Sequence, residues 1–230
     1  MATYDLEEQE QLAEIKAWWK QYGGLITNLL TAAALVILAW QGWNWYQRNQ
    51  AAQAGVVFNA LQQAVQVGDS QRVKAASGEL LEKFGGTAYA PLGALSAAKA
   101  MVEAGDAKTA KLQLIWVAEN GKDELRDLGR LRAASLLSDE KEFEQALKQL
   151  EGESTPGFAA RFAELRGDIL LAQGKKGEAE TAYQKAMSAL SSASENNGAQ
   201  KVEQGWQLQS NAVQRELLQQ KIDSLGESKQ

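Results

Sequence analysis

One stretch of the chain carries no charged residue over a length that matches a lipid bilayer. Residues 21–47 hold no Asp, Glu, Lys or Arg, and their central part is rich in Leu, Ile, Val and Ala. As a helix rising about 1.5 Å per residue, the segment 22–43 spans about 32 Å, close to the ~30 Å hydrocarbon core of a membrane. Aromatic residues flank the stretch on both sides, as they do at membrane interfaces: Trp18, Trp19 and Tyr22 before it, and Trp40, Trp43, Trp45 and Tyr46 after it.

This pattern predicts an uncleaved transmembrane anchor over residues 23–46, preceded by a cytoplasmic juxtamembrane segment over residues 1–22. A buried core helix rarely combines so long an uncharged stretch with aromatic residues at both ends. A cleavable signal peptide would begin with a short basic leader, whereas most of the charged residues before the stretch are acidic. Lys16 and Lys20 precede the stretch and only Arg48 closely follows it, a weak positive-inside bias that favours a cytoplasmic N-terminus.

A polar patch lies in the first half of the predicted anchor. Thr27, Asn28 and Thr31 are spaced so that a helix places them on neighbouring parts of its surface. They either hydrogen-bond a neighbouring membrane helix or lie near the interface, where polar side chains cost little.

Composition argues against most catalytic and metal-binding chemistry. The chain has no His and no Cys, which removes Ser-His-Asp and Cys-His nucleophiles, the usual zinc and copper ligands, and disulfides. The net charge of −5 and the lack of a basic run argue against nucleic-acid binding. The sequence also lacks a glycine-rich phosphate-binding motif. We therefore predict a protein that is not an enzyme, with no catalytic residues, no cofactor and no metal.

The remaining residues predict an all-α repeat domain. Apolar residues recur at three- and four-residue spacing, and short breaks interrupt the helical stretches. Successive breaks are about 35 residues apart, and a small or aliphatic residue follows each of them five positions later. This pattern is typical of tetratricopeptide repeats. The turn residues are Gly68, Gly105, Lys141 and Gly174, and the residues that follow them are Val73, Ala110, Ala146 and Ala179.

The fourth repeat fits the consensus best, because glycine, alanine and tyrosine occupy its helix-contact and turn positions. Earlier repeats are more divergent: Lys141 replaces a turn glycine, and the Trp of the fourth consensus position is missing throughout. A generic antiparallel helix bundle therefore stays open as an alternative. The repeat-signature residues are Gly105, Ala110, Ala146, Gly167, Gly174, Ala179, Tyr183 and Ala186.

We expect the repeat domain to cover residues 47–190, followed by a Ser/Asn/Gly-rich linker over 191–200 and a C-terminal capping helix and tail over 201–230. A detachable partner-binding helix is the alternative for the last segment. The first helix of each repeat lines the concave face of such solenoids. By repeat offset, the residues expected to contact a partner there are Leu92, Leu95, Lys99, Leu128, Leu131, Ser135, Arg161, Glu164 and Asp168.

Three segments carry a resemblance to a known family. They read E-E-Q-E-Q-L-A-E-I-K-A-W-W-K-Q-Y-G-G over residues 7–24, G-W-N-W-Y-Q-R-N-Q over 42–50, and L-L-Q-Q-K-I-D-S-L over 217–225. Together they resemble the YfgM-like family of Gram-negative inner-membrane proteins.

The resemblance implies an ancillary subunit of the SecYEG protein-translocation channel with its repeat domain in the periplasm. It also implies a membrane-anchored periplasmic prolyl isomerase as partner and help in passing unfolded client chains to periplasmic chaperones. Two other functions stay open on the residues alone: a periplasmic envelope-assembly adaptor unrelated to the translocon, and a cytoplasm-facing tetratricopeptide adaptor of the opposite topology.

Overall fold

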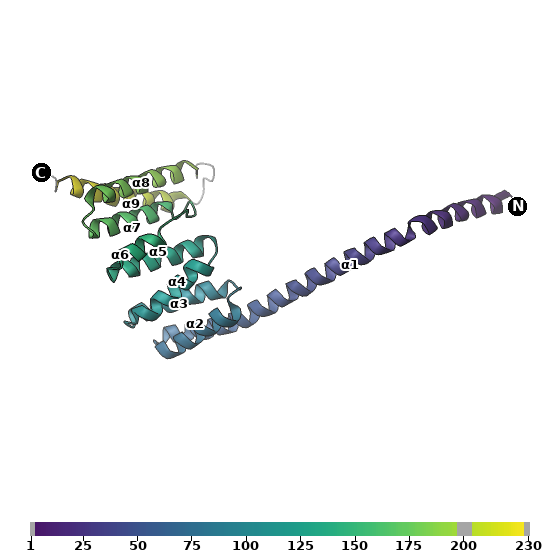
Figure 1. Ribbon diagram of the computed structural model, residues 1–230, viewed down its shortest axis with the longest axis horizontal. Coiled ribbons are helices and arrows are strands. Elements are labelled where there is room, and N and C mark those ends of the chain that lie inside the picture. Colours follow the sequence, from purple (N-terminus) through teal and green to yellow (C-terminus); the bar gives the residue numbers. More distant parts are fainter. Residues whose placement is uncertain (1–2, 197–203, 228–230) are drawn as a thin grey trace. The chain divides into compact units, whose positions relative to one another are not determined.

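The computed structural model describes residues 3–196 and 204–227, with side chains described for residues 12–13, 16–192 and 212–225. These residues form helices joined by turns and short loops, without a strand among them, so the predicted all-α class is confirmed. The chain divides into two compact units, Met1–Ala52 (unit 1) and Gln53–Gln230 (unit 2). The helices are α1 (Thr3–Gln66), α2 (Ser70–Phe84), α3 (Tyr89–Glu103), α4 (Ala107–Asn120), α5 (Asp123–Asp139), α6 (Phe143–Gln149), α7 (Ala159–Ala172), α8 (Lys176–Asn196) and α9 (Gln204–Glu227), labelled in Figure 1.

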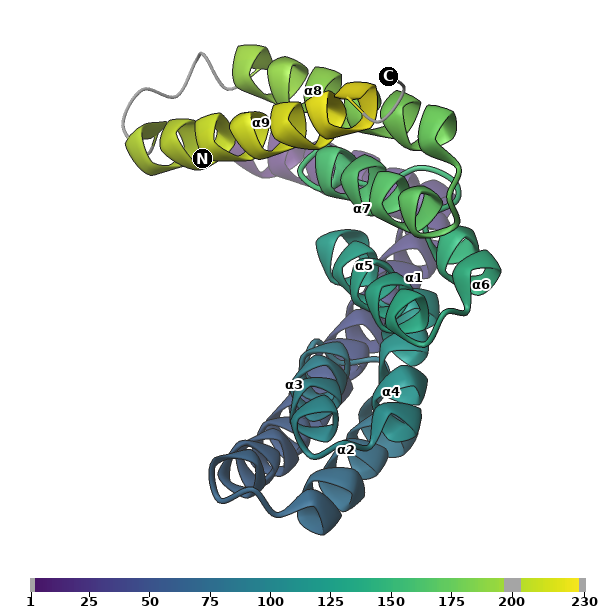
Figure 2. The same cartoon turned by 90° about the vertical axis from the view of Figure 1, so that its left-hand side faces the viewer.

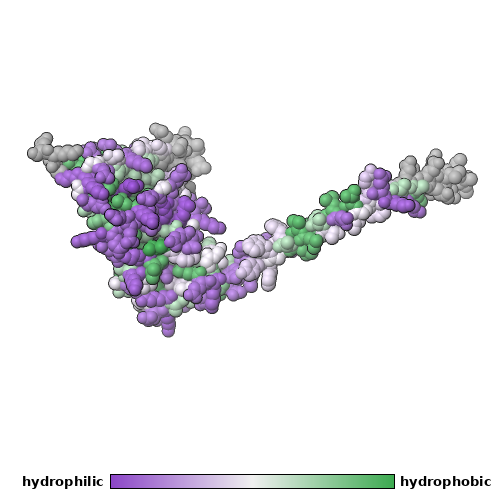
Figure 3. Space-filling view, in the orientation of Figure 1, coloured by the Kyte–Doolittle hydropathy of each residue, from purple (hydrophilic) through white to green (hydrophobic). Residues whose placement is uncertain are grey.

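Unit 1 is the N-terminal part of α1, and most of the apolar side chains described for it are exposed. Between Leu25 and Leu38 the large aliphatic residues are exposed, from 59% for Ile37 to 72% for Leu29, except for Ile26, which is half-buried. Figure 3 shows these residues as green, hydrophobic stretches along the helix. Only 6% of the most apolar window is buried, and the helix is long and apolar enough to cross a membrane. A buried core helix would show the opposite burial.

Unit 2 is a stack of helical hairpins. The end of α1 pairs with α2, and α3–α4, α5–α6 and α7–α8 follow, with α9 packed against α8. Figure 2 shows α3 and α5 on the inner side of the stack and α4 and α6 on its outer side. Three contiguous clusters of buried Ala, Leu, Val, Met and aromatic side chains run through the hairpins. This arrangement confirms the predicted tetratricopeptide-like domain.

The four predicted turns share one backbone conformation. In each, the turn residue has a positive φ, and the next residue donates its N–H to the carbonyl five positions back, as in a Schellman motif. Glycine adopts this conformation without strain, whereas the lysine of the third turn adopts it at a cost. The φ values are 68° at Gly68, 78° at Gly105, 64° at Lys141 and 77° at Gly174. The hydrogen bonds join Asp69 to Ala64 (2.9 Å), Asp106 to Met101 (2.8 Å), Glu142 to Leu137 (2.8 Å) and Lys175 to Leu170 (2.9 Å).

The residues five positions after each turn are buried, as their spacing indicated. Val73 is 1% exposed, and Ala110, Ala146 and Ala179 are completely buried. Each donates its N–H to the carbonyl of the residue that follows the turn residue, which starts the second helix of the hairpin. The regular spacing in the sequence therefore reflects a repeated packing position in the structure.

Glycines hold neighbouring helices close together at two kinds of position. A Cβ on Gly167 of α7 would lie 2.4 Å from the Tyr183 ring of α8, so this glycine allows the two helices of one hairpin to meet. A Cβ on Gly93 would lie 2.5 Å from Leu80, and one on Gly129 would lie 2.7 Å from Val117. These two glycines instead allow successive hairpins to stack.

The C-terminal boundaries differ in detail from those expected. Helix α8 continues to Asn196, so residues 191–196 of the expected linker are helical, and residues 197–200 lie outside the described residues. Helix α9 covers most of the expected capping segment. At the other end, unit 2 begins at Gln53, whereas the repeat domain was expected from residue 47.

Candidate functional site

The aromatic residues around the predicted anchor are exposed on unit 1. Before the apolar stretch, the Trp18 ring lies 5.8 Å from the Tyr22 ring and 6.4 Å from the Trp19 ring, centroid to centroid. After it, the Trp43 and Tyr46 rings lie 6.2 Å apart. All seven rings have exposed fractions from 42% to 69%. Exposed amphipathic rings at both ends of an apolar helix suit the headgroup regions of a bilayer.

The polar patch of the anchor is partly satisfied within its own helix. The Thr27 hydroxyl donates to the Gly23 carbonyl at 2.7 Å, and the Thr31 hydroxyl donates to the Thr27 carbonyl at 2.8 Å. These bonds remove the cost of burying two hydroxyl protons in lipid. Of the three predicted residues, Asn28 has an exposed side chain, and its contact with a neighbouring helix stays a prediction.

The predicted partner-contact residues occupy α3, α5 and α7, the first helices of three hairpins. Leu95 is 6% exposed and belongs to the core, while Leu128 and Leu131 are half-buried against it. Leu92 and Arg161 are exposed. The other four residues fall into two groups, one between α3 and α5 and one between α7 and α9. Whether any of them contacts a partner stays a prediction.

Lys99 and Ser135 line one groove between α3 and α5. It encloses about 450 Å³ and has an apolar floor that includes Val102, Leu114 and Leu136. Charged side chains of both signs form its rim, since Lys99, Glu103, Arg132 and Asp139 all line it. An apolar floor with a mixed rim suits a peptide segment better than a small charged ligand.

Glu164 and Asp168 form the second group, where they bind a lysine from α9. Lys221 Nζ lies 2.7 Å from Asp168 Oδ1, 3.0 Å from Asp168 Oδ2 and 3.0 Å from Glu164 Oε1. Gln214 of α9 donates to Glu164 Oε2 at 3.0 Å, and the Tyr183 hydroxyl donates to Asp168 Oδ1 at 2.7 Å. The lysine side chain also lies over the Tyr183 ring, 5.4 Å from its centroid. We call Glu164, Asp168 and Tyr183 the acidic pocket.

Burial and charge act together on the groups of this cluster. Burial favours the neutral amine of Lys221, but its bonds to Asp168 and Glu164 outweigh burial and raise its pKa. Burial, followed by the bond to Asp168, raises the pKa of Tyr183. Lys221, which pairs with Glu164 and Asp168, therefore stays charged at neutral pH. Because their side chains remain 21–41% exposed, each pair contributes no more than about 1 kcal/mol to stability.

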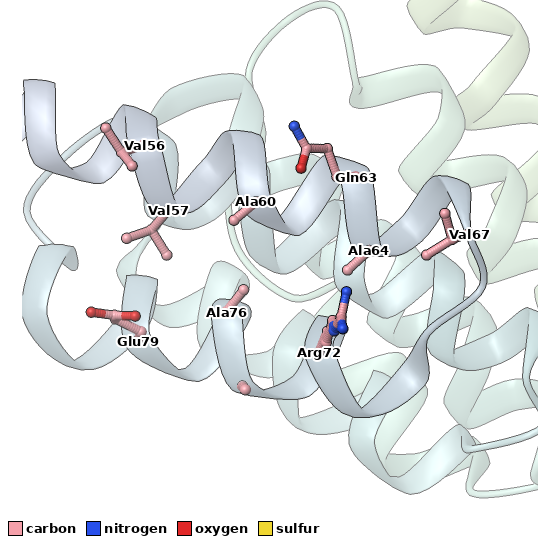
Figure 4. Close-up of a pocket in the computed structure, with 10 residues that line it drawn as sticks. Val56, Val57, Ala60, Gln63, Ala64, Val67, Arg72, Ala76 and Glu79 are labelled. Atoms are coloured by element: carbon pink, nitrogen blue, oxygen red, sulfur yellow. The ribbon is translucent and has the colours of Figure 1, made fainter.

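A second groove lies on the first hairpin, between the end of α1 and α2. Figure 4 shows Val56, Val57, Ala60 and Val67 on one wall, with Arg72 and Glu79 on the other helix. The groove encloses about 550 Å³. Val56 and Val67 are 70% and 73% exposed. The first hairpin, at the end of the stack, therefore presents exposed apolar surface.

A buried polar network fixes the loop before α7. Asp127 of α5 is completely buried and accepts hydrogen bonds from the Thr155 N–H at 2.6 Å and from Arg130 at 3.2 Å. Burial alone would favour the neutral acid, but these partners outweigh it and lower the pKa of Asp127. The Arg130 guanidinium also donates to the carbonyls of Gln149, Glu151 and Glu153.

Sequence reasoning found neither this network nor the acidic pocket. The one available signal for the pocket was Glu164 and Asp168 at i and i+4, two like charges on one face of a helix, which need a cation nearby. Nothing in the residues around Asp127 distinguishes it from the exposed acids of the same helix.

Comparison with known proteins extends over both units. Residues 16–227 match the model of the family described as tetratricopeptide repeat-like domain. The chain is 30% identical to a protein of Neisseria gonorrhoeae, over 96% of this chain and 98% of that one, and 30% identical to one of Haemophilus influenzae, over 80% and 90%. A protein of Escherichia coli is 27% identical, over 80% and 88%. All three are named ancillary SecYEG translocon subunit.

Proposed function

The chain belongs to the tetratricopeptide repeat-like family that includes these ancillary SecYEG translocon subunits, and we propose that it is a non-catalytic, membrane-tethered scaffold at the SecYEG translocon. The observation that carries the proposal is the extent of the match. The Neisseria relative aligns over 98% of its own length, so both the apolar helix and the repeats are shared.

The structure supports a scaffold because each unit offers a surface for binding. The apolar helix of unit 1 would fix the chain in the bilayer, where it can lie beside the membrane helices of the channel. Unit 2 would then act at a high local concentration near the channel, since tethering makes a second contact effectively intramolecular. The grooves between its hairpins provide room for peptide segments.

We further propose that the N-terminus is cytoplasmic and that unit 2 lies in the periplasm, at the inner membrane of a bacterium. The support is the charge bias around the apolar stretch, with Lys16 and Lys20 before it and Arg48 after it. In this topology unit 2 would meet chains as they leave the channel.

The finer role rests on the family resemblance. We propose that the chain works with a membrane-anchored periplasmic prolyl isomerase and helps to hand unfolded client chains to periplasmic chaperones. The mixed charges and apolar floor of the α3–α5 groove suit transient contacts with such segments.

The topology is tested first, with two single-cysteine variants of this cysteine-free chain. Ser191→Cys and Ala13→Cys both replace exposed residues, one in each unit. Spheroplasts are labelled with a membrane-impermeant maleimide, with parallel labelling after lysis. Labelling of intact spheroplasts at position 191 alone supports the proposed topology. Labelling at position 13 alone would show a cytoplasm-facing unit 2 and exclude this function.

The translocon is then tested by site-specific photo-cross-linking. A photoreactive residue replaces Leu35 in the apolar stretch, or Lys99 in the α3–α5 groove, and adducts are identified by mass spectrometry. We expect SecYEG subunits at position 35, and periplasmic folding factors or client chains at position 99. Adducts only with cell-wall or outer-membrane assembly proteins would favour the envelope-adaptor function instead.

A further inference from the structure

We propose that the α7–α8 surface around the acidic pocket is a binding site for a partner-protein helix that carries a lysine or arginine between apolar residues, and that α9 is the chain's own exchangeable occupant of this site. The inference does not require association with the translocon. It concerns what unit 2 recognises, and its test uses the purified chain and a peptide.

The acidic pocket is built to receive a cation. Asp168 is held in place by the hydroxyl of Tyr183, whose ring is completely buried under Gly167 and so cannot turn away. Asp168 and Glu164 then present two carboxylates to one amine, with the aromatic ring beneath it. Two carboxylates and a ring face suit a lysine or arginine side chain.

The surface beside the pocket receives apolar side chains at helical spacing. Leu218 of α9 is completely buried and Leu225 is 3% exposed, and both join the cluster formed by α7 and α8. Ile222 packs half-buried between them, next to Lys221. The bound pattern is therefore apolar, basic and apolar at positions 218, 221–222 and 225, which is the spacing by which a helix binds in a groove.

The pocket lies at positions that earlier hairpins use differently. By repeat offset, Glu164 corresponds to Leu95 and Leu131, and Asp168 corresponds to Lys99 and Ser135. Of the three hairpins compared, only the last has acidic residues at both positions. This charge complementarity is what commits the site to a helix with a lysine or arginine at the position of Lys221.

Over residues 212–225, where its side chains are described, the resident helix buries fewer side chains than α7 or α8 does. Its ion pairs are partly exposed, and of its described residues only Leu218 and Leu225 are fully buried. Val213 and Leu217 on the same helix are 54% and 50% exposed. By contrast, Tyr183 joins α8 to α7 with its whole ring buried. Helix α9, which packs at the end of the stack, is thus suited to local opening.

The test measures binding of α9 in trans. A fluorescein-labelled peptide of residues 212–227 is titrated with the full chain in detergent micelles, and its anisotropy is recorded. The resident α9 competes in the wild-type chain, so binding should be weak. The double variant Leu218→Ala/Leu225→Ala loosens the resident helix but keeps the α7–α8 surface. We expect it to bind the peptide at least about tenfold more tightly, because the competent fraction rises.

A charge swap tests whether the acidic pocket itself, and not the overall charge of the α7–α8 surface, binds the peptide. In the loosened chain, Asp168→Lys should weaken peptide binding about fivefold or more, and a peptide carrying Lys221→Asp should recover part of the loss. Glu178→Lys makes the same charge change at an exposed position of α8 and should leave binding unchanged. Equal weakening by both substitutions would overturn the proposal.

A second variant that weakens the binding of α9, and so opens the site, controls for loss of folding. Lys221→Glu leaves both leucines in place and removes only the cation, so the repeats should keep their thermal melt by circular dichroism. It should also bind the wild-type peptide more tightly than the wild-type chain does. If neither opened chain binds the peptide while both melt like the wild type, the site does not exchange its helix.

Another copy of this chain could supply the same helix, so the mass of the wild-type chain is measured by light scattering at rising concentration. A constant monomer supports a different protein as partner. A concentration-dependent dimer that Asp168→Lys abolishes would show α9 exchanged between copies, and it would overturn the assignment to a partner.

Discussion

Leu35 and Leu38 of unit 1 are 62% and 65% exposed, whereas Leu61 and Leu80 of unit 2 are completely buried. Both units are α-helical, so the contrast does not come from secondary structure. In the core of unit 2 an apolar side chain meets apolar side chains of another helix. In unit 1 it meets none, and burial must come from lipid, which asks only for apolar composition and length. Unit 1 should therefore tolerate changes of shape but not of charge, whereas unit 2 should tolerate charge at its exposed positions but not changes of shape in its core.

We expect the largest difference between the two units when charged side chains are introduced. We expect Leu35→Arg/Leu38→Arg to prevent membrane insertion, because each arginine at the centre of a membrane helix costs about 3 kcal/mol on an insertion scale. Val56→Arg/Val67→Arg makes the same change at side chains of unit 2 that are equally exposed. The first variant should be extracted from membranes by alkaline carbonate, and the second should stay in the pellet. Retention of both would contradict a lipid-buried unit 1.

Shape should separate the units in the opposite sense. A Cβ on Gly167 would lie 2.4 Å from the Tyr183 ring, which has no space to move. We expect Gly167→Ala to lower the free energy of unfolding by about 1–3 kcal/mol. A Cβ on Gly24 of unit 1 or on Gly78 of α2 meets nothing within 4 Å.

Those two glycines serve as the controls. Gly24→Ala should leave membrane insertion unchanged, and Gly78→Ala should stabilise α2 by about 0.5–1 kcal/mol, since alanine favours a helix. Thermal melts of the full chain in detergent, followed by circular dichroism, measure the two changes in unit 2. Equal melting of Gly167→Ala and Gly78→Ala would contradict the close contact between α7 and α8.

These contrasts show how far the sequence could predict the molecule. Composition alone located the apolar helix, because burial in lipid requires apolar residues over a sufficient length and no specific pairing of side chains. The repeat period located the four turns, including Lys141, because a turn and its following small residue are local in sequence. The contacts of Gly93 and Gly129 were not predicted, since each depends on a helix about a dozen residues away in the preceding hairpin.

The same reason explains what was missed at the candidate site. The acidic pocket brings Glu164 and Asp168 to Lys221, more than 50 residues away. The expected concave face follows from repeat offset, but offset cannot show that Leu95 is buried in the core while Lys99 is exposed in a groove. Pairings between hairpins require the three-dimensional stack.

A buried charge is tolerated in unit 2 only where partners surround it. Asp127→Asn keeps the shape but removes the charge that Thr155 and Arg130 bind, and we expect a loss of about 1–3 kcal/mol at pH 7. The pKa of Asp127 is lowered in the folded chain. Its charge therefore stabilises the fold above the unfolded value of about 3.9, and this contribution is lost as pH falls below that value toward the folded pKa.

Denaturant titrations from pH 7 to pH 2.5 check this sign. The difference in unfolding free energy between the wild type and Asp127→Asn should be greatest near neutral pH and should shrink as the carboxylate is protonated. Asp139→Asn, at an exposed acid of the same helix, is the control and should show little difference at any pH. A difference that grows on acidification would mean that Asp127 is neutral in the fold.

The turns provide the smallest effect and a reciprocal pair of variants. Lys141 and Gly174 occupy the same turn position with φ of 64° and 77°. Lysine at positive φ is strained by about 1 kcal/mol, whereas glycine loses more chain entropy on folding, so Lys141→Gly should stabilise unit 2 by about 0.5 kcal/mol. Gly174→Lys should destabilise it by a similar or larger amount. If thermal melts show both changes with the same sign, the four turns do not share one conformational requirement, and the repeat period would then reflect helix length alone.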